Sequence, residues 1–198
     1  PVDESAPAQR LLGVKELVLV QGVTPNAGTL IFHRQIDNVW SIWTATMSGD
    51  RTPRPVLKEP FDNYMPTLSP DSRWLAYVSM SSGVHEIYVR PYPGPGAAVQ
   101  VSRNGGTEPV WSRDGTRLFY RNGDQMLATT ITTAPTLAVA APDSLFRHRY
   151  EGEMPHANFA VTDDGAFIMI GAAVGGEPDM VIVVNWLAEL RSRIAARR

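Results

Sequence analysis

A ten-residue pattern recurs along the chain at a nearly constant interval, and this repeat limits the possible folds more than any other feature. The segment WSRDGTRLFY (111–120) repeats LSPDSRWLAY (68–77) at an offset of 43 residues, with serine, aspartate, leucine and tyrosine in matching places. A third copy, VTDDGAFIMI, occupies residues 161–170, and a fainter fourth, TPNAGTLIFH, occupies residues 24–33. Repeats with a period of about 20 to 50 residues are typical of propellers and solenoids.

Each copy has the composition of a β-hairpin. Asp71, Asp114 and Asp164 are placed to hydrogen-bond the backbone of a tight turn, and Gly115 and Gly165 can supply a positive φ. β-forming residues follow each turn. A third strand is expected in each unit, over residues 39–47, 86–92, 125–132 and 180–185. Weaker fourth strands are expected over residues 54–57, 98–102 and 144–148.

Units of four short antiparallel strands, separated by proline and glycine, indicate an all-β fold of the β-propeller type. We expect a single domain, or part of one, with about four four-stranded blades that belong to a larger propeller. The units span about 14–57, 58–102, 103–148 and 149–185. A helical tail is expected over 186–198, where Leu187, Leu190 and Ile194 share one face.

The repeated turns resemble the Ser-Pro-Asp-Gly turn of TolB-type, WD40-like propeller repeats, although Ala27 replaces the turn aspartate in the first copy. Three longer stretches, EIYVRPYPGPG (86–96), GGTEPVWSRDGTRLFYRNGD (105–124) and VVNWLAEL (183–190), occur in that order. They resemble the C-terminal propeller region that follows the kinase domain in many bacterial serine/threonine protein kinases. The resemblance implies a recognition or sensor module that binds a protein or a small molecule. It favours the extracytoplasmic or periplasmic side and leaves the cytoplasm open.

Composition narrows the remaining classes of function. A formal net charge of -2 does not suit a nucleic-acid-binding protein, and no apolar run reaches the length of about 18 residues that a membrane span requires. The chain has no cysteine, which excludes disulfides, thiolate nucleophiles and cysteine-containing zinc sites. We expect no nucleic-acid partner and no membrane span in this chain.

No motif for catalysis is present. The kinase motifs are missing, and Ser79, Ser81 and Ser82 precede Gly83 without the Gly-x-Ser-x-Gly frame of a serine hydrolase. We therefore expect no catalytic residue and no cofactor. Two alternatives remain: a propeller that gates or positions a separate, prolyl-peptidase-like hydrolase domain, and a structural β module that self-assembles.

A metal site is also not expected. The local cluster of possible ligands, His148, Glu151, Glu153 and His156, matches no helical ligand motif and falls in the longest loop between strands.

Ligand-binding residues are predicted from the geometry of propellers. The connections between second and third strands, and those between successive blades, converge on one face, which is suited to binding. These segments contain Arg34, Asp37, His85, Glu86, Glu108, Arg121, Asp124 and His156. Trp74 and Trp111 are instead expected to fill the core between blades, and Arg90 to pair with a carboxylate.

The ends of the chain raise the question of how the sheet edges are covered. The last unit shows three strands, and residues 9–12 resemble a fourth strand of a preceding blade. We expect residues 9–12 to pair with residues 180–185. The ring then closes as four blades in one chain, as eight blades in a homodimer, or with missing blades supplied by a longer parent chain; the last two routes are favoured.

Overall fold

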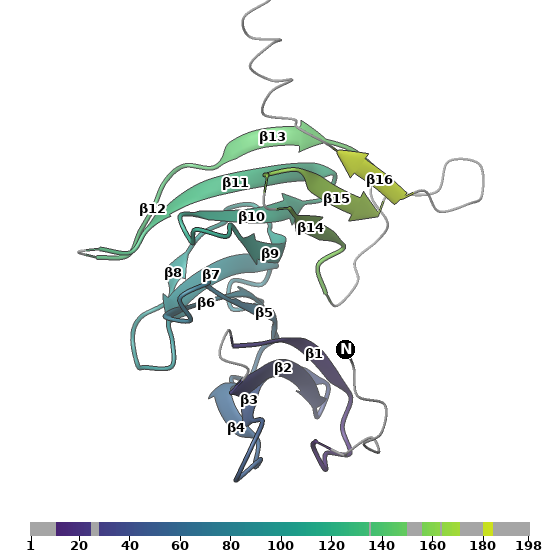
Figure 1. Cartoon of the computed structure of the whole chain (residues 1–198), viewed down its shortest axis with the longest axis vertical. Coiled ribbons are helices and arrows are strands. Elements are labelled where there is room, and N and C mark those ends of the chain that lie inside the picture. The colour runs from purple at the N-terminus through teal and green to yellow at the C-terminus, as the bar shows by residue number, and fades with distance from the viewer. Residues whose placement is uncertain are drawn as a thin grey trace, which may run out of the picture.

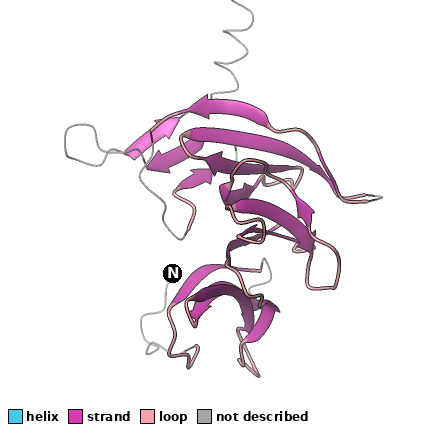
Figure 2. Cartoon of the chain, turned by 180° about the vertical axis from the view of Figure 1, so that it is seen from behind, coloured by secondary structure: helices cyan, strands magenta, loops and turns pink. Residues whose placement is uncertain are grey.

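The computed structural model describes residues 11–24, 28–134, 136–149, 156–162, 164–170 and 180–183. All the regular secondary structure in this part of the chain is β-strand (Figure 2). The all-β prediction is confirmed. The expected helix over 186–198 and the first-copy turn at residues 25–27 lie outside the described residues.

The strands form four antiparallel sheets, which we call blades 1 to 4 (Figure 1). Blade 1 contains β1 (Val18–Val23), β2 (Thr29–Ile36), β3 (Val39–Thr46) and β4 (Arg54–Leu57). Blade 2 contains β5 (Asn63–Leu68), β6 (Trp74–Ser79), β7 (Glu86–Pro91) and β8 (Val99–Gln100). Blade 3 contains β9 (Thr107–Trp111), β10 (Arg117–Asn122), β11 (Gln125–Thr132), β12 (Ala138–Val139) and β13 (Asp143–Arg147). Blade 4 contains β14 (Phe159–Val161), β15 (Phe167–Ile170) and β16 (Met180–Val183).

Within each blade, consecutive strands pair in chain order, as expected for a propeller. Blade 3 differs from the prediction because two short strands, β12 and β13, both pair with β11. β11 is eight residues long, so its edge accommodates both segments. Between them lies Pro142, which has no backbone N–H to contribute to a ladder.

The repeated turns have the predicted chemistry. In blade 3, Ser112 Oγ donates to Asp114 Oδ1 at 2.6 Å, and Asp114 Oδ1 also accepts from the backbone N–H of Thr116 at 3.0 Å. These hydrogen bonds, that from Ser112 first, lower the pKa of Asp114. Gly115 has a φ of 70°. The turns at Asp71 and Asp164 contain the same hydroxyl-to-carboxylate hydrogen bond, so the same interaction stabilises the turn in three blades.

Replacing Asp114 with alanine is expected to lower the free energy of unfolding by about 1 kcal/mol, because one side-chain acceptor of the turn is lost. Gly115→Val is expected to cost more, since valine is strained at a φ of 70°. Urea denaturation measures both changes. A neutral result for both variants would contradict the assigned role of the turn.

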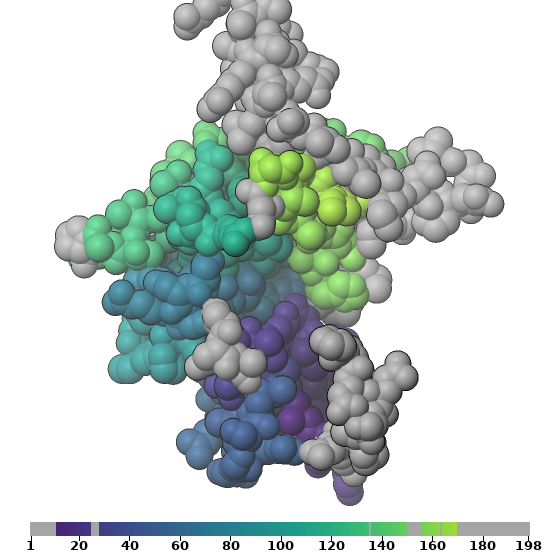
Figure 3. Space-filling view, in the orientation of Figure 1, coloured from purple at the N-terminus to yellow at the C-terminus, as the bar shows by residue number. Residues whose placement is uncertain are grey.

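Alternate side chains of each blade pack against its two neighbours. In β6, Leu75 and Tyr77 pack against blade 1, together with Ile31. Ala76 and Val78 of the same strand pack against blade 3. A third cluster joins blades 3 and 4 through Phe119, Met126, Ala128, Phe159, Phe167 and Met169. The period of two along each strand thus produces an apolar core between every pair of adjacent blades, and blades 2 and 3 form one continuous surface in Figure 3.

The two tryptophan predictions are confirmed. Trp111 is buried in the core between blades 2 and 3, where its Nε1 donates to the carbonyl oxygen of Thr67 at 3.3 Å, and Trp74 packs against the same core. The expectation for Arg90 is wrong within the described residues. Its Nε is buried without a hydrogen-bond partner, and its guanidinium forms no ion pair with a described carboxylate.

The predicted pairing at the chain ends is not found where the structure can test it. Leu11 and Leu12 are not in a strand; they pack against the face of blade 1 that points away from blade 2, near Phe32 and Trp43. Residues 9, 10, 184 and 185 lie outside the described part. Leu11 and Leu12 thus cover apolar side chains on this face of blade 1.

Candidate functional site

A pocket lies where the β6–β7 connection, the connection from blade 2 to blade 3 and the β10–β11 turn meet. We call it the blade 2–3 pocket. Its volume is about 420 Å³, and it is lined by residues 84–86, 104–107 and 121–123. It brings together His85, Glu86 and Arg121, which sequence reasoning placed on one face.

The wall formed by the connection between blades has a fixed backbone. Gly106 N–H donates to the carbonyl oxygen of His85 at 2.8 Å, which joins two sides of the pocket. Asn104 and Gly105 have φ values of 66° and 109°. A Cβ at Gly106 would lie 2.5 Å from Ser102 Oγ, so only glycine fits this position. The pocket is therefore built on backbone that local sterics and hydrogen bonds define.

Glu86 begins β7 and is 3% exposed. Its Oε1 accepts from the backbone N–H of Gly105 at 3.0 Å, and its Oε2 accepts from the hydroxyl of Ser102. The same hydroxyl oxygen accepts from the N–H of Ile87 at 2.8 Å. The carboxylate thus holds the pocket wall against β7.

Glu108 and Arg121 form a buried ion pair. Arg121 Nη1 lies 3.0 Å from Glu108 Oε1, and the two side chains are 8% and 1% exposed. Glu108 Oε2 accepts from the backbone N–H of Asn158 at 2.9 Å, which ties blade 3 to blade 4. Glu108 is therefore enclosed between the blades and is not part of the pocket lining, whereas Arg121 and Glu86 line the pocket.

His85 and His33 are linked through the side chain of Tyr64. His85 Nδ1 is hydrogen-bonded to the hydroxyl of Tyr64, and the Tyr64 ring packs edge-on against His33, with the ring centroids 6.2 Å apart. His33 is fully buried and also contacts Trp40. Burial, followed by the charge of His156, lowers the pKa of His33 to about 4. The imidazole of His33 is therefore neutral at neutral pH.

The other predicted residues lie outside the blade 2–3 pocket. Asp37 and Asp124 occupy the exposed hairpin turns of blades 1 and 3. Arg34 stacks on Trp43, with its Cζ 3.8 Å from the ring centroid, and lies 3.9 Å from a carboxylate oxygen of Glu16. The structure therefore unites three of the eight predicted residues in one cavity and distributes the rest over three blades.

Sequence reasoning missed several residues of the pocket. Asn122 Nδ2 donates to the carbonyl oxygen of Asn104 at 3.0 Å, linking two walls. A sequence signal did exist, since Asn104 precedes Gly105-Gly106 and Asn122 precedes Gly123, and such pairs favour positive φ. The partner that each asparagine meets is set by the packing of the two blades.

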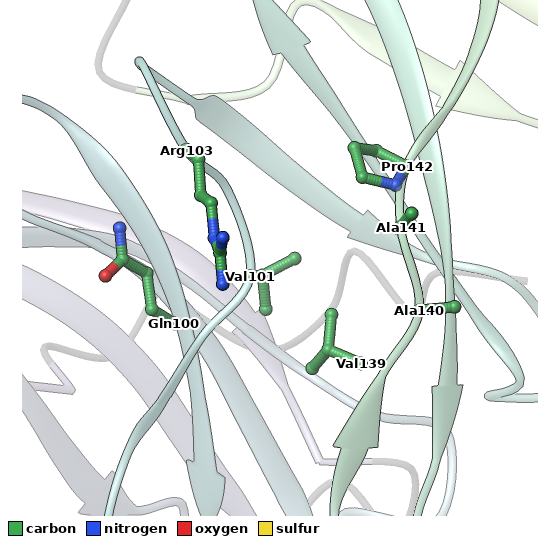
Figure 4. Close-up of a pocket in the computed structure, with 7 residues that line it drawn as sticks. All are labelled: Gln100, Val101, Arg103, Val139, Ala140, Ala141 and Pro142. Atoms are coloured by element: carbon green, nitrogen blue, oxygen red, sulfur yellow. The ribbon is translucent and has the colours of Figure 1, made fainter.

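A second groove, of about 310 Å³, lies between the outer edges of the same two blades. Figure 4 shows Arg103 and Gln100 on one side and the apolar side chains of Val139 to Pro142 on the other. Arg103 is the charged residue in its lining, and sequence reasoning singled out none of the lining residues.

Two further observations bear on the class of protein. In the described ranges, no three histidine, aspartate or glutamate side chains gather as a metal site would require; Glu151 and Glu153 of the sequence cluster lie outside these ranges. The described part also contains no helix with the length and apolarity needed to cross a membrane.

Comparison with known proteins gives matches at the level of structure. No model of a protein family matches the chain, and no curated protein matches it. The structure is similar to TolB from Acinetobacter baumannii, with a TM-score of 0.62, 13% identity and coverage of 81% of this chain and 39% of TolB. A protein described as TolB from Agrobacterium tumefaciens gives a TM-score of 0.56 at 17% identity, with coverage of 68% and 51%. Oligogalacturonate lyase from Vibrio parahaemolyticus gives 0.53 at 17% identity, with coverage of 78% and 45%.

These likenesses concern the fold, because all the identities are below 20%. The chain spans between 39% and 51% of the length of these three proteins. One of the three is named as an enzyme, so the fold alone does not decide between binding and catalysis. The described chain has the fold of a sector of a TolB-type β-propeller.

Proposed function

We propose that this chain is a non-enzymatic recognition module that binds a protein or small-molecule ligand in the blade 2–3 pocket. The observation that carries the proposal is the pocket itself, which gathers His85 and Glu86 at the start of β7 and Arg121 near the end of β10 around the connection between the two blades. Its volume of about 420 Å³ falls in the range of known ligand sites. A rigid site of this kind loses little conformational entropy on binding.

The polar groups of the pocket favour binding over catalysis. Among the described residues, His85 Nδ1 is hydrogen-bonded to the hydroxyl of Tyr64 and Arg121 Nη1 donates to Glu108; neither bond links a base to a serine or threonine hydroxyl. Nucleophilic catalysis requires a nucleophile within hydrogen-bond reach of a base. The resemblance of three sequence stretches to kinase-associated propellers supports a sensor region of a bacterial serine/threonine kinase or of a TolB-like protein, on the extracytoplasmic side.

A variant that fills the pocket tests the proposal. Val84 is at the pocket lining and is 51% exposed, so Val84→Trp adds bulk at the mouth without removing a polar group. We expect it to weaken binding of a pocket ligand at least tenfold. Binding is measured by NMR titration of the whole chain with a set of cationic, neutral and anionic amino-acid amides.

Val20→Trp is the matched control, because Val20 is also an exposed valine, at 60%, and lies on β1. If Val84→Trp binds every probe with the affinity of the parent chain, the binding site lies elsewhere. The same holds if Val84→Trp and Val20→Trp weaken binding equally.

A further inference from the structure

The charge of Glu86 is not matched by a cation. Its carboxylate is 3% exposed, and both oxygens accept hydrogen bonds from neutral groups, the N–H of Gly105 and the hydroxyl of Ser102. No lysine, arginine or histidine among the described residues forms an ion pair with it. Buried charges in proteins are normally paired, because transfer of an isolated charge out of water is costly.

The arginine of the same pocket cannot supply the missing charge. Arg121 Nη1 is 3.0 Å from Glu108 Oε1, and Arg121 Nε and Nη2 both lie 3.4 Å from the carbonyl oxygen of Gly123. The positive charge of Arg121 is thus balanced by Glu108. With Glu86 added, these three buried groups carry a net charge of minus one.

The negative charge of Glu86 affects a neighbouring hydroxyl group. Burial, and then the negative charge of Glu86, raises the pKa of the Tyr120 hydroxyl to about 12. Neutral acceptors lie beside the carboxylate. Asn122 uses its Nδ2 as a donor to Asn104, which leaves Oδ1 as an acceptor at the pocket wall. The groups around the cavity therefore suit a ligand that is positively charged and rich in N–H donors.

We propose that the blade 2–3 pocket binds a lysine or arginine side chain of a protein partner, whose ammonium or guanidinium completes the missing ion pair of Glu86. This inference rests on the proposed function, because it names the ligand class of the same pocket. Exposed Val84 at the lining can pack against the aliphatic stem of such a side chain. The carboxylate of Glu86 destabilises the free chain, in which it has no cation beside it, and stabilises the complex, in which the ligand supplies the cation.

NMR titration of the whole chain with four probes tests the inference. The probes are the Nα-acetyl amides of lysine, arginine, norleucine and glutamate. We expect the two cationic probes to shift the amide resonances of His85, Gly105 and Asn122, and to bind at least tenfold more tightly than the norleucine probe. Higher salt concentration should weaken the cationic probes selectively.

Glu86→Gln separates a binding charge from a structural one. Glutamine retains the shape and can still accept from Gly105, so the fold is preserved while the charge is removed. We expect this variant to lose the preference for the cationic probes and, without ligand, to unfold at a higher temperature than the parent chain. Glu59→Gln is the control, since Glu59 is exposed and lies outside the pocket lining. Glutamine can still accept from Asn63 Nδ2, the bond that Glu59 forms at 3.1 Å, so this variant should change neither property.

The possible failures are distinguishable. If neutral or anionic probes bind as tightly as the cationic ones, and Val84→Trp weakens this binding, the cation inference is overturned and the proposed function stands. Cationic binding that persists in Glu86→Gln would also overturn it. If the parent chain binds no cationic probe, the inference is overturned. The proposed function is decided separately, by whether Val84→Trp weakens the binding of any of the cationic, neutral and anionic amino-acid amides.

Discussion

Glu108→Ala is expected to lower the free energy of unfolding by about 3 to 5 kcal/mol, because it removes one partner of a buried, hydrogen-bonded ion pair. The charge left behind is Arg121, whose side chain is 8% exposed. The substitution also removes the acceptor for the Asn158 N–H, and this bond joins blades 3 and 4. Urea denaturation followed by tryptophan fluorescence measures the loss.

The exposed ion pair between Arg117 and Asp143 provides the matched control. Its atoms are 3.7 Å apart, and the side chains are 34% and 71% exposed. Asp143→Ala should cost at most about 1 kcal/mol, because solvent screens such a pair. The double variant Glu108→Met, Arg121→Met should regain part of the loss, since it removes both charges together. A single Glu108→Ala variant as stable as Asp143→Ala would refute the role of Glu108 as a tie between blades.

The strands were largely predictable, because their signals are local. The 43-residue repeat locates each hairpin, and β-forming residues locate the strands between turns. The predicted third strand over residues 125–132 matches β11, and the predicted fourth strand over residues 54–57 matches β4. The predicted fourth strand over residues 144–148 matches β13, whereas β12 was missed because it depends on how two segments share one edge of β11.

The site was predictable in outline only. Three of the predicted residues, His85, Glu86 and Arg121, line one pocket because they lie at or beside strand ends of adjacent blades; their part in ligand binding stays a prediction. The depth of Glu108 was not predictable, because it depends on Arg121 and on Asn158, which is 50 residues away in the sequence. The sequence of one repeat does not show which of its polar side chains the neighbouring blade buries.

The neutral state of His33 could not be predicted from the sequence. In the repeat, His33 occupies the place of Tyr77 and Tyr120, which are both buried, but the repeat does not define whether an imidazole at this place finds a hydrogen-bond partner. His33 is fully buried, and neither ring nitrogen has a hydrogen-bond partner among the described residues. The blade thus accepts an imidazole only in its neutral form.

Acidification is therefore expected to destabilise the chain through His33. Its pKa is about 4 in the folded chain and 6.5 in its unperturbed state, so the unfolded chain binds the proton first as the pH falls. The stability due to neutral His33 is present above pH 6.5 and is lost between pH 6.5 and 4, with a total of about 3 kcal/mol. The nearby charge of His156 acts in the same direction.

His33→Phe should remove this part of the pH dependence. Phenylalanine retains an aromatic ring beside Trp40 and Tyr64 and has no nitrogen to leave unpaired. The free energy of unfolding of the parent chain should fall relative to that of His33→Phe by about 3 kcal/mol between pH 7.5 and 4. Asp114 and the other turn aspartates, whose pKa values are lowered from 3.8, lose their contributions at lower pH and cancel in this difference. Parallel curves for the parent and His33→Phe would show that His33 does not cause the acid sensitivity.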